Sequence, residues 1–380
     1  MMDYIFNSFK IKYINLNNLF GKLDLNNINK ITLYINLESV LSKLHRDYYE
    51  ETLLTCTKSE LANNHKALIS NIINLAAHYR LFFTRSKVAS NIVFYYSDFD
   101  GYKRYNNTVY IDKYRKTYFD TYHNPKRDLL LGMINEAVRI SHSIIDYIDR
   151  VFILSSDRLE SSVIPYMAHK DQRLKSDLNL ILTRDIYDFQ YVNHGFLVLY
   201  PEKEESIILH KKNLMKFLRF KNDYEDKYHV DISPKLLPFI LSIIGDKKRS
   251  LPKVTGIGFK KIYKSLEKLY DKEFIIDEDP STMSIEHLAE LLKTNNGFYD
   301  NGIREIIGNN YFAIDLDRQL NIASDSHNHE ILDNVNNKFD TNGLKKLNDK
   351  VFSDYPLHLI ELNNYSKNKI FEGVDEIWTK

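Results

Sequence analysis

The chain has 380 residues, of which 43% are hydrophobic and 27% are charged, a composition typical of folded globular proteins that excludes disorder as the dominant state. Its 52 basic and 51 acidic residues give a net charge of +1, so any binding of nucleic acid has to come from local patches. The one cysteine, Cys56, excludes an internal disulfide and a cysteine-rich zinc site.

Two further features bear on where the protein acts. The first residues, MMDYIFNSFKIKYINL, are too polar for a secretory signal, and the longest apolar run, near Leu236–Ile244, is too short to cross a membrane. We therefore expect a cytoplasmic protein with no membrane partner. The chain is rich in Asn, Lys, Ile and Tyr, whose codons are A/T-rich. This composition favours an A/T-rich genome such as that of a virus, and for a viral protein we expect the host cytoplasm.

Short, nearly continuous apolar runs predict strands that are buried on both faces of a parallel sheet. In chain order they are Ile31–Asn36, Ile92–Tyr96, Val151–Leu154 and Leu178–Leu182, with Phe196–Tyr200 as an edge or outer strand. Stretches with helical spacing, Leu61–Phe83 and Leu129–Ile148, lie between them. Strands that alternate with helices predict an α/β layer fold.

A basic, tyrosine-rich stretch separates the second and third predicted strands. From Lys103 to Arg127 it has seven basic residues and two acids, and tyrosines recur between Lys103, Arg104, Lys113 and Arg115. Tyrosine rings stack on unpaired bases while Lys and Arg contact phosphates, so the stretch is a candidate for binding a single strand. An amphipathic helix whose tyrosines pack on the body of the protein is an equally good interpretation.

The pattern of apolar residues changes after a charged connector near residue 228. Beyond it the pattern is helical, and the next strand is predicted only at Tyr311–Leu316. From 271 to 380 the chain has 21 acidic and 11 basic residues. We therefore divide the chain into 1–228, a helical part 229–305, and an acidic C-terminal extension 306–380.

The most informative segment is a glycine turn between two helices, Leu241–Leu269. Gly256 and Gly258 allow a positive φ and close approach of the backbone to a phosphate, which the free N–H groups of the next helix can bind. Lys260, Lys261 and Lys264 add positive charge. From Lys247 to Lys268 there are eight basic residues and one acid, a good footprint for a nucleic-acid backbone. The alternative is a helical hairpin with a solvated lysine face.

The segment GDKKRSLPKVTGIGFKK resembles the helix-three-turn-helix of the 5′ nuclease superfamily, which includes flap endonucleases and 5′–3′ exonucleases. Weaker similarities to the same family follow in the same order along the chain, at Leu33–Leu41, Ile92–Arg104, Glu160–Ile164, Leu182–Val192 and Tyr311–Ile322. The resemblance implies an α/β, PIN-like domain with a mostly parallel twisted sheet and helices on both faces. It also implies a helix-hairpin-helix that binds duplex or branched DNA, with K⁺ at the hairpin.

The carboxylates of this family hold two Mg²⁺ ions that position the scissile phosphate and activate water. Residues that match the family's acids position by position are Asp100, Glu160, Asp185 and Asp246. At other matched positions the acids are absent, because the chain has Asn36, Ser162 or Val163, Tyr187 and Arg249 instead. Arg249 would place a permanent positive charge beside a metal. Capping or turn formation explains single aspartates such as Asp185 and Asp246 without any catalysis.

Three functions follow from these residues. The first is a DNA-binding protein of viral replication, repair or transcription that has a degenerate metal site, no resident cofactor and a viral protein partner. The second is an active nuclease that uses Mg²⁺ or Mn²⁺ at a reduced site, with Asp98, Asp157 or Asp188 as substitute ligands. The third is a structural or assembly protein that no longer binds DNA.

Overall fold

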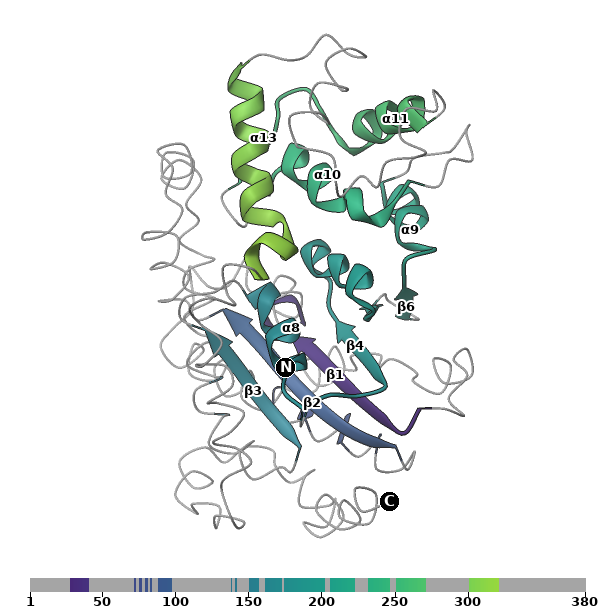
Figure 1. The fold of residues 1–380 in the computed structure, drawn as a ribbon, viewed down its shortest axis with the longest axis vertical. Helices are drawn as coiled ribbons and strands as arrows, with labels where there is room; N and C mark the ends of the chain where they lie inside the picture. Colours follow the sequence, from purple (N-terminus) through teal and green to yellow (C-terminus); the bar gives the residue numbers. More distant parts are fainter. Residues whose placement is uncertain are drawn as a thin grey trace, which may run out of the picture.

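The computed structural model describes residues 28–40, 88–97, 150–156, 161–172, 174–201, 206–222, 232–246, 251–270 and 301–320, together with single helical residues between 72 and 83 and at 138 and 141. A sheet forms one end of the described part, and a group of helices stands over one edge of that sheet (Figure 1).

The sheet has six strands in the order β3-β2-β1-β4-β5-β6. Their bounds are Lys30–Asn36 for β1, Ala89–Ser97 for β2, Val151–Ser156 for β3, Leu178–Leu182 for β4, Leu197–Pro201 for β5 and Ser206–Leu209 for β6. Neighbouring strands from β3 to β5 pair in parallel, and β6 pairs antiparallel with β5. The predicted mostly parallel α/β sheet is therefore confirmed, and β6 is an addition that the sequence pattern did not reveal.

Both faces of the central strands are covered, which explains why they are apolar without a break. Successive residues such as Tyr34 and Ile35 on β1, or Val93 and Phe94 on β2, are all 0% exposed. Because successive side chains of a strand point to opposite faces, this burial requires cover on both sides. On one side Val163, Ile164 and Met167 pack against Tyr34 and Val93 in the main core.

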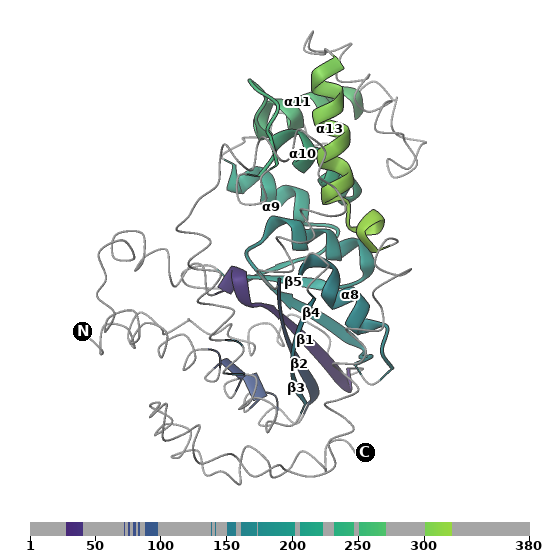
Figure 2. The same cartoon turned by 90° about the vertical axis from the view of Figure 1, so that its left-hand side faces the viewer.

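Helix α8 lies beside the sheet, and helices α9, α10, α11 and α13 lie above one of its edges (Figure 2). The helices are η2 (Ser161–Val163), α8 (Ile164–His169), the 3-10 helix η3 (Ile186–His194), α9 (Leu214–Lys221), η4 (Pro234–Leu236), α10 (Leu237–Ile244), α11 (Phe259–Tyr270) and α13 (Asn301–Ile314). Helices α10 and α13 pack along each other. No helix in the described ranges is long and apolar enough to cross a membrane.

The structure corrects one predicted element and bears on one predicted boundary. Tyr311–Leu316 is not a strand: Tyr311 to Ile314 form the last turn of α13, and Leu316 begins another helical turn. The run is apolar because Ile314 and Leu316 enter the core, and a buried helix end has the same local texture as a strand. The expected boundary between 305 and 306 lies inside α13.

Candidate nucleic-acid interface and the carboxyl edge of the sheet

A buried carboxylate, Asp188, lies at the carboxyl edge of the sheet and accepts three hydrogen bonds through one oxygen. Its Oδ2 accepts from Asn36 Nδ2 at 2.7 Å, from the Tyr95 hydroxyl at 2.9 Å and from the Thr183 hydroxyl at 2.7 Å. Asp188 is 0% exposed. Burying a carboxylate is costly unless donors replace water, and three donors do so here. We call these four residues the Asp188 cluster.

The strand register brings the Asp188 cluster together. Asn36 is the last residue of β1 and stands opposite Tyr95 of β2, while Thr183 directly follows β4, whose Leu182 stands opposite Ile35. In a parallel sheet the strand ends meet at one edge, where functional residues commonly lie. Helix η3 starts three residues after Thr183 and returns Asp188 over this edge. The cluster therefore joins three strands and one helix.

The orientation of the Asn36 amide is fixed at both ends. Its Oδ1 accepts from the Ser39 backbone N at 2.9 Å while its Nδ2 donates to Asp188. An aspartate at position 36 would place two carboxylate oxygens at the 2.7 Å now spanned by a hydrogen bond, an arrangement that needs a shared proton or a cation. The Asn36 amide contacts Asp188 Oδ2 as a donor, without either.

Burial and the charge of Asp188 also set the state of the nearby tyrosines. Burial first, and then the Asp188 carboxylate, raise the pKa of Tyr95 well above its ordinary value. The pKa of Tyr191 is raised by burial first and then by Asp188. Both phenols therefore keep their protons at neutral pH, and Tyr95 acts as a hydrogen-bond donor to Asp188.

Of the described acids that the sequence singled out, Asp185 caps a helix through its side chain and Asp246 takes part in a turn through its backbone. Asp185 is the N-cap of η3, where its Oδ1 accepts from the Tyr187 backbone N at 3.1 Å. Asp246 follows α10 and forms a two-way backbone bridge with Leu251, at 3.0 and 2.8 Å. Tyr187, at the position of an expected acid, is buried. Asp100, Glu160 and Arg249 lie outside the described residues, as do the substitutes Asp98 and Asp157.

The described donors do not fit a two-metal centre. No group of three or more His, Cys, Asp or Glu in the described ranges is arranged to hold a metal ion. Asp188 Oδ2 already accepts three hydrogen bonds, and the carbonyl oxygen of Asn36 accepts from Ser39. A metal ligand needs lone pairs directed at the ion, and here those oxygen atoms are directed at donors.

The glycine hairpin between α10 and α11 depends first on Gly245, which the sequence analysis passed over. Gly245 ends α10 at φ +66°, and a Cβ there would lie 2.6 Å from the Pro252 carbonyl oxygen and 2.7 Å from that of Leu251. Gly256 also has a positive φ, +75°, but nothing lies within 4 Å of its would-be Cβ. The first glycine is therefore required by packing and backbone, and the second by backbone alone.

Gly245→Ala is expected to lower the free energy of unfolding by about 3 kcal/mol or more, because a left-handed backbone and a clash with main-chain atoms coincide. Gly256→Ala is the matched control, with a similar φ and open space, and should cost about 1 kcal/mol. Urea unfolding of the two variants beside the parent measures both. Equal losses would mean that the contact at Gly245 relaxes without cost.

Gly258 differs from the expectation of an unusual backbone. Its φ is not positive, and nothing lies within 4 Å of its would-be Cβ. Its carbonyl accepts from Lys261 N at 3.0 Å and Ile262 N at 3.1 Å, so Gly258 is the capping position of α11. The first N–H groups of a helix have no acceptor within it. The open space at Gly258 leaves those groups accessible to a ligand.

Glu267, the acid between Lys247 and Lys268, is buried, whereas described lysines of this stretch are exposed. Lys260 and Lys264 are exposed on α11, as is Lys253 in the turn. Glu267 of α11 is 1% exposed, and its Oε1 lies 3.9 Å from Arg219 Nη1 of α9. Glu267 is therefore turned into the protein and matched by a cation, so it does not offset the lysine charge at the surface.

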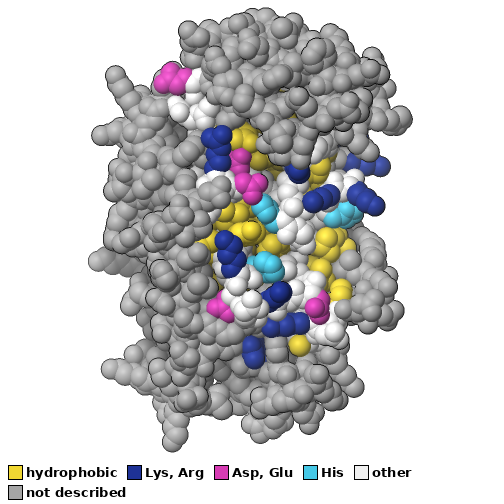
Figure 3. Space-filling view, in the orientation of Figure 1, with side chains coloured by type: hydrophobic (Ala, Val, Ile, Leu, Met, Phe, Trp, Pro, Cys, Tyr) yellow, Lys and Arg dark blue, Asp and Glu magenta, His cyan; other side chains and the backbone are white. Residues whose placement is uncertain are grey.

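The described surface as a whole is basic. On the face drawn in Figure 3, Lys and Arg side chains outnumber Asp and Glu among the coloured residues. In the described ranges the exposed acids are Asp177, Glu305 and Asp317, and the exposed bases are Lys170, Lys175, Lys211, Lys212, Lys216, Lys221, Lys235, Lys253, Lys260, Lys264 and Arg318. The whole chain has a net charge of only +1, whereas the exposed surface of the described ranges is basic. Lys103, Arg104, Lys113 and Arg115 lie outside the described residues.

No family model matches the sequence, and no curated protein is similar to it in sequence. Among solved structures, the chain is similar to the 5′-exonuclease of phage T5 with bound zinc, at 13% identity and a TM-score of 0.45, over 86% of this chain and 98% of that one.

Two further structures are similar over most of their length. One is the bacteriophage T5 D15 flap endonuclease in complex with DNA and metal ions, at 12% identity and a TM-score of 0.42, over 86% of this chain and 98% of that one. The other is the catalytic core of Rad2 in complex with a DNA substrate, at 12% identity and a TM-score of 0.35, over 77% of this chain and 98% of that one. At these identities and TM-scores, the role of each residue has to come from this chain's own geometry.

Proposed function

We propose that this protein binds double-stranded or branched DNA through the hairpin between α10 and α11, as a member of the 5′ nuclease superfamily that no longer cuts. The observation that supports DNA binding most directly is the first turn of α11. Gly258 leaves the start of this helix open, Lys260 and Lys264 are exposed along it, and Lys253 is exposed in the preceding turn, while Glu267 of the same helix is buried. Helix N–H groups with adjacent cations match a phosphate.

The Asp188 cluster supports the non-catalytic part of the proposal. Two-metal hydrolysis needs several carboxylate oxygens directed at the ions. At this edge Asn36 provides an amide, Tyr95 and Thr183 provide hydroxyl donors, and all three donate to Oδ2 of Asp188. The edge is therefore stabilised by hydrogen bonds, in a form that no metal is needed to hold together. A partner among viral replication or transcription proteins belongs to the same proposal.

A cleavage assay beside a binding titration tests the proposal. The full chain is titrated with a linear duplex and with a 5′-flap duplex of equal length, and the same DNAs are incubated with it in Mg²⁺ and in Mn²⁺. We expect binding that weakens with salt, with no cleavage in either ion. Metal-dependent cleavage would establish the alternative, an active nuclease with a reduced site. Absence of both binding and cleavage would leave a structural role.

A substitution at Gly258 separates phosphate contact from folding. Gly258→Asp is expected to keep or raise stability, because aspartate is a preferred residue at a helix N-cap. It should weaken DNA binding at least about tenfold, because a carboxylate would face the phosphate. Gly258→Asn is the matched control, equal in size and also a good cap but uncharged. Equal affinities for both variants and the parent would show that no phosphate approaches this position.

A further inference from the structure

Helix α13 (Asn301–Ile314) connects the hairpin with the sheet by hydrogen bonds in its C-terminal part, which lie about one turn apart. Toward the hairpin, Asn310 is 2% exposed and its Nδ2 donates to the Ser242 carbonyl at 2.7 Å and to the Pro252 carbonyl at 2.6 Å. Ser242 belongs to α10, and Pro252 to the loop that leads into the glycine turn. One amide therefore holds α13 against both parts of the DNA-binding hairpin.

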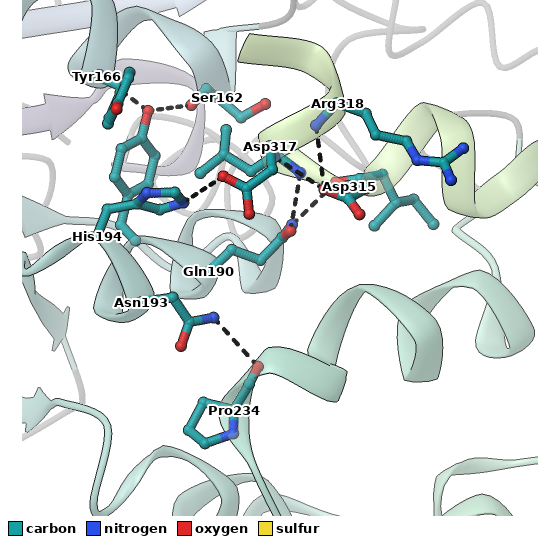
Figure 4. Close-up of polar contacts among 12 residues, drawn as sticks. Ser162, Tyr166, Gln190, Asn193, His194, Pro234, Asp315, Asp317 and Arg318 are labelled. Carbon is teal, nitrogen blue, oxygen red and sulfur yellow. Dashed lines mark hydrogen bonds and ion pairs between the residues drawn. The ribbon is translucent and has the colours of Figure 1, made fainter. Parts of the chain in front are cut away.

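One turn beyond Asn310, the carboxyl end of α13 is held by Gln190, which is 3% exposed on η3 (Figure 4). Gln190 Nε2 donates to the Ile314 carbonyl at 3.1 Å and to the Tyr187 carbonyl at 3.1 Å, and its Oε1 accepts from the Leu316 N at 3.1 Å. The chain turns between Ile314 and Leu316. The glutamine therefore uses both its donor and its acceptor to close this turn.

The turn itself is rigid for local reasons. Asp315 Oδ1 accepts from Asp317 N at 2.9 Å and from Arg318 N at 3.3 Å, which caps the helical turn 316–320. Leu316 and Leu320 enter the main core. On the outer side, Asp317 Oδ1 lies 3.5 Å from Nε2 of His194, the last residue of η3. The end of α13 is thus fixed on a helix that also carries Asp188.

We infer that α13 and the turn at Asp315 form a strut that sets the position of the hairpin relative to the carboxyl edge of the sheet, with Gln190 as its positioning residue. The path runs from Pro252 through Asn310 and the last turn of α13 to Gln190, and along η3 to the Asp188 cluster. Rigid elements joined by buried, satisfied hydrogen bonds transmit position between distant sites. Asn193, whose Nδ2 donates to Pro234 O at 3.4 Å, is a second and weaker link.

The strut has a consequence for DNA that rests on the proposed function. A duplex held at the hairpin leaves it along a fixed direction relative to the sheet edge. A branched DNA that touches both places gains from this fixed geometry, because little orientational freedom is lost on binding. A linear duplex held at the hairpin alone gains nothing from it. Gln190 should therefore affect discrimination between the two DNAs, and not affinity for the linear one.

The first experiment measures the strut without DNA. Spin labels are placed at the exposed Lys175→Cys and Lys253→Cys in a Cys56→Ser chain, and their distance distribution is recorded. We expect one narrow distribution in the parent, which Gln190→Met and Asn310→Leu both broaden. Ser265→Ala is the control: the Ser265 hydroxyl donates to the Lys261 carbonyl at 2.9 Å inside α11, and its loss should leave the distribution narrow.

The second experiment measures discrimination. Gln190→Met should bind a linear duplex within twofold of the parent and lose the parent's preference for a flapped duplex. Unchanged distributions in folded Gln190→Met and Asn310→Leu proteins would overturn the strut, whatever DNA does. If the parent binds no DNA, the proposed function fails, and the distance measurement alone still decides on the strut. If Gln190→Met does not fold, Asn310→Leu decides it.

Discussion

Asp188→Ala is expected to lower the free energy of unfolding by about 3–5 kcal/mol, because three donors lose a buried acceptor at once. Asn36, Tyr95 and Thr183 all donate to the same Asp188 oxygen, and none can turn to water without moving a strand end or η3. Urea unfolding measured in buffer without divalent ions gives the value. Affinity for linear duplex DNA should change little once the variant is folded.

Asp185→Ala is the matched control for that variant. Asp185 lies on the same helix, three residues earlier, and caps it through Tyr187 N, so its loss should cost about 1 kcal/mol. The pair also separates two roles for Asp188. If the Asp188 carboxylate is structural, Asp188→Ala loses much stability and Mg²⁺ does not change the result. A small loss of stability, together with loss of Mg²⁺-dependent cleavage that the parent possesses, would contradict the structural role and make Asp188 a metal ligand.

Lys260→Glu combined with Lys264→Glu is expected to weaken binding of duplex DNA on the order of 100-fold at low salt. The plot of log affinity against log salt should flatten by about two units of slope, one for each lost phosphate contact. Both lysines are exposed on α11, so folding should be unaffected. The loss should be the same for unrelated DNA sequences, because contacts to phosphates carry no base information.

Lys170→Glu combined with Lys175→Glu provides the control with the same change in net charge. These two lysines are also exposed, and they lie after α8 and before the start of β4, away from the hairpin. Their reversal should leave most of the affinity and most of the salt slope intact. Equal losses from both double variants would mean that overall charge, and not the hairpin, determines binding.

The sheet could be predicted from the sequence because its signal is local. Runs such as Ile31–Asn36 and Leu178–Leu182 became β1 and β4, since strands buried on both faces have to be apolar throughout. The hairpin was also local, because a left-handed turn needs glycine and Gly256 supplies it. The strand expected at Tyr311–Leu316 was wrong because it rested on a local signal alone. A short apolar run does not distinguish a strand from a buried helix end.

The sequence alone therefore determined the sheet, the glycine turn and the absence of an acid at positions 36 and 187. Only the tertiary structure decided what Asp188 does, because its partner Asn36 is 152 residues away and the strand register alone brings them together. It alone revealed Gln190, whose partner Leu316 is 126 residues distant, and Gly245, whose neighbours belong to the far side of the hairpin. A hydrogen bond depends on positions within tenths of an ångström, and no residue pattern along the chain records positions of that kind.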